Sequence, residues 1–384
     1  MLQTPNRTNT TLIAEAERLI PWLREQSAVI EAGRRLTPEV HAAMIDAGFY
    51  RFTMPETYSN GGEGTLSEAM RILETLARGD ASTAWSVWAA LGTPAMSAFL
   101  SEAGAREMFG SPEACVVGSI AAMGRAVAVD GGYRVSGRWP FLSGICQATF
   151  AGGTCFVFDD DTQRAGPDGQ PLVIIPSFPI DDCVVIDTWY TTGLRGTGSN
   201  DMTVEDLFVP TDRVVDFSAP PRPGLSPLHY LHVDNAANMT VAAMALGIAA
   251  VALEAFRELG MTKRRMTGEL LAETPDAKIA LAHAEVRFAQ ARGYLYETAD
   301  LVWEDAVAGS LPGESWLPRT SLASTSTVDA AVEIVSSLYR AAGSSAIFAS
   351  HAFDRCLRDI YTLAAHKTVQ QENYLLHGGA TFVE

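Results

Sequence analysis

The sequence predicts an α+β fold that is mostly α-helical, with its strands gathered in one central region. Apolar residues recur at helical spacing over residues 1–111 and again over residues 223–384. Between them, residues 112–222 are rich in Val, Thr, Phe and Gly and carry turn signals at short intervals. Helices and strands are segregated rather than alternating every ~30 residues, which excludes a doubly wound sheet. We therefore expect three domains: an N-terminal α-helical domain, a central β-domain and a C-terminal helical bundle.

The N-terminal region carries recognisable helix starts and stops. Five helices are expected, beginning near Ile13, at Pro38, after Thr65, at Ala81 and at Pro94. The pattern Thr65-Leu-Ser-Glu68 matches a capping box that precedes an apolar run. Gly48 is expected to end the second helix, and the fifth is expected to run from Pro94 to Phe109.

The other two regions differ in period. The central region predicts strands over residues 126–129, 151–158, 172–175 and 202–209, and the lack of intervening helices favours antiparallel pairing in a sandwich or barrel. Long C-terminal helices are expected over residues 275–308 and 321–342. The most apolar window, Val241–Phe256, is shorter than the ~20 residues of a bilayer span, so we expect a helix buried inside the bundle.

The charge balance excludes several classes of function. The 384 residues include 28 Lys and Arg against 45 Asp and Glu, which gives a formal net charge of −17. Nucleic-acid binders and proteins that dock on anionic membranes need basic surfaces, so neither partner is expected. Charged residues make up only 19% of the chain, below the usual ~25%, which suggests that surface is hidden between subunits.

Motifs for several kinds of chemistry are missing. The five cysteines are scattered without a CxxC pair, and the N-terminus has no apolar segment after a basic stretch, so we expect a cytoplasmic protein with reduced thiols. The seven histidines form no HExxH motif, and no metal site is expected. No strand-to-helix GxGxxG, no phosphate-binding P-loop and no GxSxG elbow occur.

Two segments of the central region combine aromatic, hydroxyl and glycine residues. In Trp139-Pro-Phe-Leu-Ser-Gly144, strand alternation places Trp139, Phe141 and Ser143 on one face, able to wall a flat heteroaromatic ring and to bond its edge. An aromatic strand packed in a core explains the same pattern. The segment Gly193–Asp201 is glycine-rich, but it leads into a strand, so a tight turn with a solvated Arg195 also explains it.

His366 lies near the end of the last long helix, eight residues after Arg358. A histidine acts as a general base near neutral pH, or, when charged, interacts with the last carbonyls of a helix. Trp85 and Trp88 are three residues apart on a helix and fit either core packing or the lining of a substrate site.

These motifs together resemble one known family. In order and spacing they are similar to the oxygenase components of two-component (group D) flavin-dependent monooxygenases, within the acyl-CoA dehydrogenase fold superfamily. The resemblance runs over residues 12–368. It implies an N-terminal helical domain, a central β-barrel or sandwich and a C-terminal four-helix bundle, with a flavin between the last two. The segments that carry it are Ser82–Trp85, Val117–Ser119, Tyr133–Ser143, Gly193–Asn200 and Arg358–His366.

The resemblance also implies roles for individual residues. Ser143 matches a serine that bonds near flavin N5 and C4a, and His366 matches a histidine that acts as a base toward a substrate hydroxyl. Trp85, Trp88 and Tyr230 would line the substrate side. The residues expected to bind the cofactor, with the arginines as candidates for its phosphate, are Met123, Gly124, Trp139, Phe141, Ser143, Arg195, Arg264 and Arg265.

The implied activity is hydroxylation of an aromatic or phenolic substrate by reduced flavin and O2 through a C4a-hydroperoxyflavin. Reduced FMN is expected, with FAD as the alternative, supplied by a separate NAD(P)H:flavin reductase, and the family's tetramers imply a homotetramer. Residues 145–148 depart from the pattern of relatives that act on aromatic polyketides, which keeps N- or S-oxygenation open. An acyl-CoA dehydrogenase-like FAD oxidoreductase is the other alternative, with Glu254 or Glu258 as its base.

Overall fold

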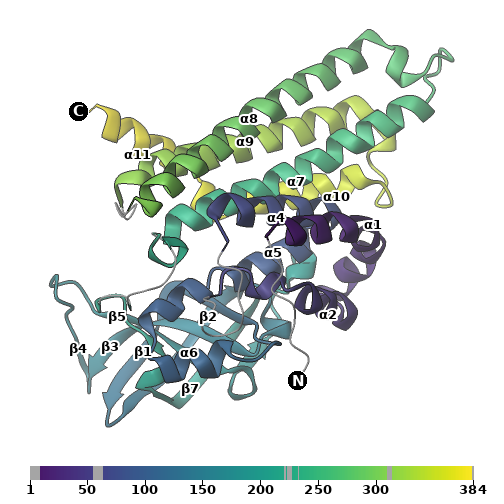
Figure 1. Ribbon diagram of the computed structural model, residues 1–384. Helices are drawn as coiled ribbons and strands as arrows, with labels where there is room; N and C mark the ends of the chain where they lie inside the picture. The colour runs from purple at the N-terminus through teal and green to yellow at the C-terminus, as the bar shows by residue number, and fades with distance from the viewer. Residues whose placement is uncertain are drawn as a thin grey trace.

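The computed structural model describes residues 9–54, 64–219, 222, 227–231, 233–308 and 314–382. A β-domain occupies one end of the molecule and long C-terminal helices the other, with N-terminal helices packed between and beside them (Figure 1). The expected α+β class, with helices, then a sheet, then helices in chain order, is confirmed.

The N-terminal region is helical wherever the structure describes it. Two of its helices, α4 and α5, lie between the β-domain and the C-terminal helices (Figure 1). Its elements are α1 (Asn9–Gly33), α2 (Pro38–Ala47), η1 (Phe49–Arg51), α4 (Leu66–Gly79), α5 (Ala81–Leu91), η2 (Pro94–Phe99) and α6 (Glu102–Phe109).

Short-range side-chain chemistry sets several of these boundaries. The capping box is confirmed: Thr65 Oγ1 accepts from the Glu68 N–H, and the Glu68 carboxylate accepts from the Thr65 N–H. Gly48 ends α2 in the left-handed conformation, with φ of 85°. The expected single helix from Pro94 to Phe109 is wrong, because Leu100 is extended and Ser101 starts a new helix by capping the Gly104 N–H.

The β-domain is one sheet with the order β6-β7-β2-β1-β3-β5-β8, in which β4 pairs with β3. The antiparallel expectation is wrong for β1 and β3, which run parallel. After the β1–β2 hairpin the chain crosses through η3 (Ile145–Gln147) and starts β3 at the same end as β1, on its other side. The strands are β1 (Val116–Val129), β2 (Gly132–Leu142), β3 (Phe150–Asp159), β4 (Thr162–Gln163), β5 (Val173–Pro179), β6 (Val184–Ile186), β7 (Asn200–Pro210) and β8 (Val214–Val215).

The C-terminal region contains five α-helices among the described residues. Helix α7 packs against α4 on one side and against α9 and α10 on others, and the most apolar window of its residues Asp234–Thr262 is 83% buried. By length and composition this helix could cross a membrane, but its apolar surface is already covered by protein. The helices are α7 (Val233–Thr262), α8 (Pro275–Val307), α9 (Leu317–Ala342), α10 (Ala352–Ala364) and α11 (Glu372–Thr381).

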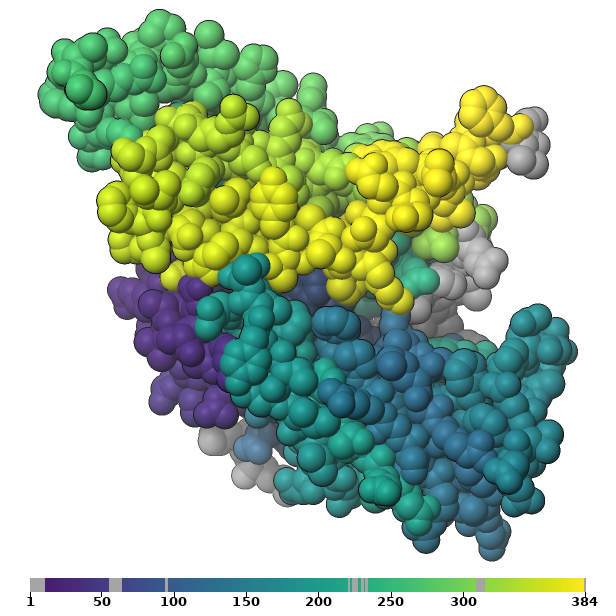
Figure 2. Space-filling view, turned by 180° about the vertical axis from the view of Figure 1, so that it is seen from behind, coloured from purple at the N-terminus to yellow at the C-terminus, as the bar shows by residue number. Residues whose placement is uncertain are grey.

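Figure 2 shows the molecule from behind. The C-terminal helices, in green and yellow, lie over the blue and teal β-domain, and the surface is hollowed between the two. The hollow lies near the place where α10, η11 (Lys367–Val369), α5 and the sheet meet.

Candidate functional site

A cavity of about 690 Å³ lies where the three regions of the chain meet. Its walls come from α4, α5, α6, strands β1, β2, β3 and β5, and the starts of α7 and η11. The lining is mostly apolar. Among the lining residues that the structure describes, Asp234 and Lys367 are the charged ones, and His366 is a third titratable group.

Ser143 is placed at the cavity wall by the end of β2. Its backbone N–H closes a tight turn onto the Phe141 carbonyl at 3.0 Å. Its Oγ accepts a hydrogen bond from Trp85 Nε1 at 2.9 Å and lies 2.7 Å from Ser199 Oγ. The hydroxyl is therefore held from two sides, by α5 and by the loop before β7.

His366 lies two residues after α10, where it caps η11. Its ring packs edge-on against Trp85 and Trp88, with centroids 5.2 and 5.7 Å apart, and its Nδ1 lies 2.9 Å from Thr368 Oγ1. Burial, with a smaller contribution from the neighbouring charge of Lys367, lowers the His366 pKa to about 4. Near pH 7 this environment favours the neutral imidazole, and with it the interpretation as a general base over that of a charged residue at the helix end.

Trp85 joins these two groups. One edge of its buried indole donates to Ser143, and the ring contacts the His366 imidazole. Trp88 packs against Trp85 at 4.8 Å and donates its own N–H to Thr240 on α7. Both tryptophans line the cavity, so the structure brings Ser143, His366, Trp85, Trp88 and Phe141 together around one space.

The expectation that Trp139 shares this wall is wrong. Its side chain is fully buried and donates to the Thr154 carbonyl at 2.8 Å. The ring fits because three glycines surround it: a Cβ added at any of them would lie within 2.6 Å of a ring atom. These are Gly124, Gly137 and Gly153.

Strand alternation fails here for a local reason. The ladder between β2 and β7 shifts register between Trp139 and Leu142, and Phe141 has a φ of 62°. The bend turns Trp139 into the core, while Phe141 stands on the cavity side with its side chain 70% exposed.

The other residues expected to bind the cofactor do not line the cavity. Met123 is exposed, and Gly124 makes room for Trp139. Arg195 lies in the loop before β7, and its Nε is buried without a hydrogen-bond partner within the described ranges.

Arg264 and Arg265 follow α7, and the α7–α8 connection lies at the end of the bundle far from the β-domain (Figure 1). The side chain of Tyr230 lies outside the part of the chain that the structure describes.

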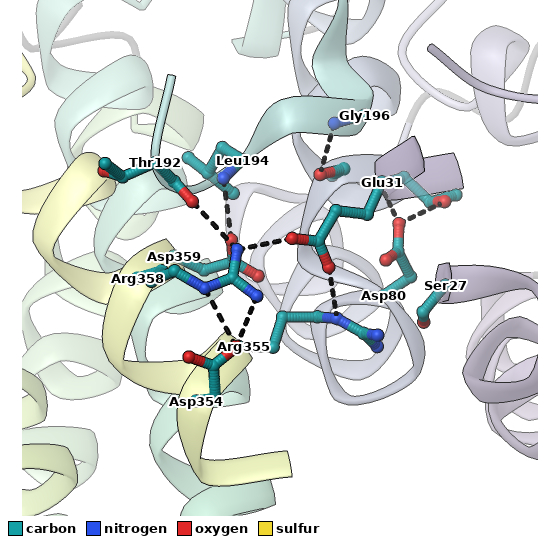
Figure 3. A network of polar contacts seen from close by, with 12 residues as sticks. Ser27, Glu31, Asp80, Thr192, Leu194, Gly196, Asp354, Arg355, Arg358 and Asp359 are labelled. Carbon is teal, nitrogen blue, oxygen red and sulfur yellow. Dashed lines mark hydrogen bonds and ion pairs between the residues drawn. The ribbon is translucent and has the colours of Figure 1, made fainter. Parts of the chain in front are cut away.

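The loop before β7 is anchored by a polar network (Figure 3). Asp359 Oδ1 accepts from the Leu194 N–H at 2.7 Å, and Ser82 Oγ accepts from the Gly196 N–H at 3.2 Å. Next to it, Arg358 bonds the Thr192 carbonyl and forms ion pairs with Glu31 and Asp354. Burial raises the Asp359 pKa to about 7, and the nearby Asp80 adds to the effect.

Sequence reasoning missed the residues that act through this loop. Ser199 and Thr197 line the cavity and bond in series with Ser143, and Asp359 fixes the loop from α10. The glycine-rich segment and the Arg358-Asp359 pair are both recognisable in the sequence. Their spacing does not show that Asp359 contacts the glycine-rich segment in the folded chain.

The structure also tests the carboxylates offered as a dehydrogenase base. Glu254 is paired with Arg24 and Arg78, and neither Glu254 nor the exposed Glu258 lines the cavity. Neither carboxylate is therefore placed to act as the base of a dehydrogenase in this cavity.

Comparison with known proteins gives consistent matches. Residues 15–109 match the family Acyl-CoA dehydrogenase, N-terminal domain, and residues 239–371 match Acyl-CoA dehydrogenase, C-terminal domain. An indole-3-acetate monooxygenase of Acinetobacter baumannii is 28% identical, over 92% of this chain and 89% of its own. The oxygenase subunit HsaA of a flavin-dependent monooxygenase from Rhodococcus jostii is also 28% identical, over 95% of this chain and 97% of its own. The crystal structure of 3-HSA hydroxylase from Rhodococcus sp. RHA1 superposes with a TM-score of 0.88, at 26% identity and 97% coverage of both chains.

Proposed function

The chain belongs to the acyl-CoA dehydrogenase superfamily, and from this premise we propose that it is the oxygenase component of a two-component flavin-dependent monooxygenase that hydroxylates an aromatic substrate. The observation that carries the proposal is the placement of Trp85 between Ser143 and His366. One indole thereby sets a hydroxyl on one side of an apolar cavity and a neutral imidazole on the other.

The residues at the sheet side of the cavity fit a flavin ring. Phe141 offers an exposed aromatic face, and Ser143 offers a hydroxyl beside it. The ladder between β1 and β3 is interrupted between Ser119 and Gly124, which leaves backbone groups near Ile120 and Ala121 for the polar edge of the ring. A reduced flavin bound there would supply the electrons that activate O2, and O2 would be the source of the oxygen atom.

The residues on the opposite side fit an aromatic substrate with an ionisable hydroxyl. Trp85 and Trp88 provide ring surfaces, and the apolar lining excludes water. In the tautomer that carries its hydrogen on Nδ1, the ring donates a hydrogen bond to Thr368 Oγ1 at 2.9 Å and gives up the longer, 3.5 Å capping contact with the Thr368 N–H. His366 Nε2 is then free to accept the substrate's hydroxyl proton. Loss of that proton raises electron density on the ring carbon to be oxygenated.

The partners follow from the same proposal. A separate flavin reductase supplies reduced FMN, with FAD as the alternative, in the cytoplasm. The candidates for the flavin phosphate are Arg195, whose buried Nε has no hydrogen-bond partner among the residues that the structure describes, and Arg264 or Arg265 of another subunit. A homotetramer is supported by apolar side chains such as Ile279 and Val286, which are 57% exposed on α8.

The decisive experiment combines the purified protein with a flavin reductase, NADH and FMN or FAD in isotopically labelled dioxygen. A panel of phenols and indoles is offered together with amines and thioethers. We expect one labelled oxygen atom in a hydroxylated aromatic product, detected by mass spectrometry, and little hydrogen peroxide while that substrate is consumed.

Other outcomes identify the alternatives. Labelled product from the amines or thioethers alone would place the enzyme among N- or S-oxygenases and overturn aromatic hydroxylation. A purified protein that holds stoichiometric FAD and is reduced anaerobically by an acyl-CoA would establish a dehydrogenase and refute the oxygenase proposal.

A further inference from the structure

A chain of side-chain hydroxyls runs along the cavity wall behind Ser143. Trp85 Nε1 donates to Ser143 Oγ at 2.9 Å, and Ser143 Oγ lies 2.7 Å from Ser199 Oγ. Ser199 Oγ lies 2.7 Å from Thr197 Oγ1, which donates to the Leu194 carbonyl at 2.9 Å. The chain therefore begins at a group that can only donate and ends at a group that can only accept.

Counting hydrogens gives this chain one direction. Each hydroxyl carries a single hydrogen, and the hydrogen of Thr197 is used on the Leu194 carbonyl. The 2.7 Å contact between Ser199 and Thr197 then needs the hydrogen of Ser199, and the 2.7 Å contact between Ser143 and Ser199 needs the hydrogen of Ser143. Ser143 has no hydrogen left for the cavity, so toward the cavity its Oγ is an acceptor.

The end of the chain is fixed by the surrounding fold. The Leu194 carbonyl also accepts from Trp189 Nε1 at 3.0 Å and from the Thr197 backbone N–H at 3.2 Å, and the Leu194 N–H is held by the buried Asp359 from α10. Figure 3 shows Asp359 directed at this loop beside the arginine network. A Cβ at Gly193 would lie 2.0 Å from the Arg358 carbonyl, so the loop lies tight against the helix.

We propose that Ser199 and Thr197 are positioning residues that fix Ser143 as a hydrogen-bond acceptor and thereby make the site select reduced over oxidised flavin. The inference rests on the proposed function, in which Ser143 faces flavin N5. Reduced flavin carries a hydrogen on N5 and donates it to an acceptor. Oxidised flavin presents a lone pair there, which faces the lone pair of Ser143 and gains no hydrogen bond.

The test measures dissociation constants of oxidised FMN and of anaerobically reduced FMN by fluorescence and absorbance titration. Ser199→Ala frees the hydrogen of Ser143 to donate to oxidised N5. Thr197→Val removes the acceptor for Ser199, which lets Ser199 donate to Ser143 with the same result. Since one hydrogen bond is worth ~0.5–1.5 kcal/mol, each variant should lower the oxidised-to-reduced ratio of dissociation constants by ~3–10-fold.

Two controls separate this effect from general damage. Thr197→Ser keeps the hydroxyl and should restore the wild-type ratio. Ser86→Ala removes a buried hydroxyl of α5 that bonds the Ser82 carbonyl outside the chain, and it should also leave the ratio unchanged. Thermal melting confirms that each variant is folded.

The possible outcomes are distinct. Unchanged ratios in folded Ser199→Ala and Thr197→Val, with both flavin forms still bound, would overturn the positioning role and leave the oxygenase proposal standing. A wild-type protein that binds neither form of FMN or FAD would refute the proposed function itself, and this inference with it.

Discussion

At the scale of single residues, the His366 environment determines how the proposed chemistry depends on pH. Its ring is enclosed by two indoles, and burial lowers its pKa to about 4 from the ordinary 6.5. The basic form is therefore present throughout the neutral range. A base of higher pKa would be stronger, but a part of it would be protonated at neutral pH. His366 is a weaker base that is almost entirely in its unprotonated form there.

The first prediction concerns the hydroxylation yield per flavin oxidised. In the wild type it should show no inflection near pH 6.5 and should fall only as the pH approaches 4, where His366 becomes protonated. His366→Ala should lower the yield by ~10²-fold or more and should remove that acid limb, as followed by product chromatography. His351→Asn, which keeps a capping side chain at the start of α10, is the matched control and should behave as wild type. A wild-type inflection at pH 6.5 that His366→Ala abolishes would contradict this environment.

The second prediction concerns the backbone at Phe141. A non-glycine residue with φ of 62° is strained, and Phe141 sits there with an exposed ring. Phe141→Gly and Phe141→Ala both delete the ring and should weaken flavin binding alike. Only glycine relieves the strain, so Phe141→Gly should be more stable than Phe141→Ala by ~1 kcal/mol in urea unfolding. Equal stabilities would show that the loop does not hold this residue under strain.

At the scale of elements, helix α10 and the loop before β7 are coupled through Asp359. The carboxyl is buried and bonds the Leu194 N–H, and its pKa is raised to about 7 from the ordinary 3.8. A raised pKa means that the folded protein holds the proton more tightly than the unfolded chain. This contribution to stability is complete below pH 3.8 and is lost as the pH rises through 7.

The third prediction follows from this loss of stability with rising pH. Asp359→Asn keeps an oxygen for Leu194 but has no charge to bury at high pH. Its free energy of unfolding, relative to wild type, should rise between pH 5 and pH 8 by on the order of 2 kcal/mol, measured by urea unfolding. Asp276→Asn, at an exposed carboxyl in the first turn of α8, should show no comparable trend. A relative stability that stays flat over this range would mean that Asp359 is already ionised at pH 5.

Sequence patterns identified the elements whose boundaries are set locally. Thr65 with Glu68 and Gly48 act within a few residues of themselves, so their motifs are readable. The parallel pairing of β1 with β3 depends on where the chain returns, which no periodicity records. The turn of Trp139 into the core depends on a register shift and on three glycines, two of which lie on the neighbouring strands β1 and β3.

The candidate site divides in the same way. Ser143 and His366 stood out because family motifs surround them, and the structure brings them to one cavity. The roles of Ser199 and Thr197 depend on hydrogen bonds across the β-domain, and that of Asp359 on a contact between α10 and a loop 165 residues before it. Such relations are tertiary, so the sequence contains the residues without showing that they meet.

At the scale of the whole molecule, the low fraction of charged residues is reflected in apolar side chains exposed on the C-terminal helices. Large apolar side chains stand exposed on their outer surface, including Met261, Ile279, Val286 and Leu375. Where such side chains form a contiguous patch, they commonly mark an interaction surface. In the proposed tetramer, this is the surface through which the subunits would meet.

The fourth prediction is that the protein sediments at four times the mass of one chain. Val286→Glu, which places a charge on the exposed face of α8, should shift the population to smaller species in analytical ultracentrifugation. Val184→Glu changes a residue of similar exposure on β6, at the edge of the sheet, and should leave the assembly intact. A monomeric wild type, or equal effects of the two variants, would rule out this interface.

The position of Trp85 has a consequence for how such an enzyme changes its substrate range. One rigid indole contacts both Ser143 and His366 and therefore fixes the distance between them. The separation between the flavin and the substrate, which these two residues would contact, is fixed in the same way. Away from these two groups the cavity is also lined by the apolar side chains of Leu100, Met108 and Phe109, and we expect the shape of larger substrates to be accommodated by such residues. We expect substitutions of these residues to change which substrates fit while leaving Ser143, Trp85 and His366 in place, so that substrate range can change separately from the chemistry.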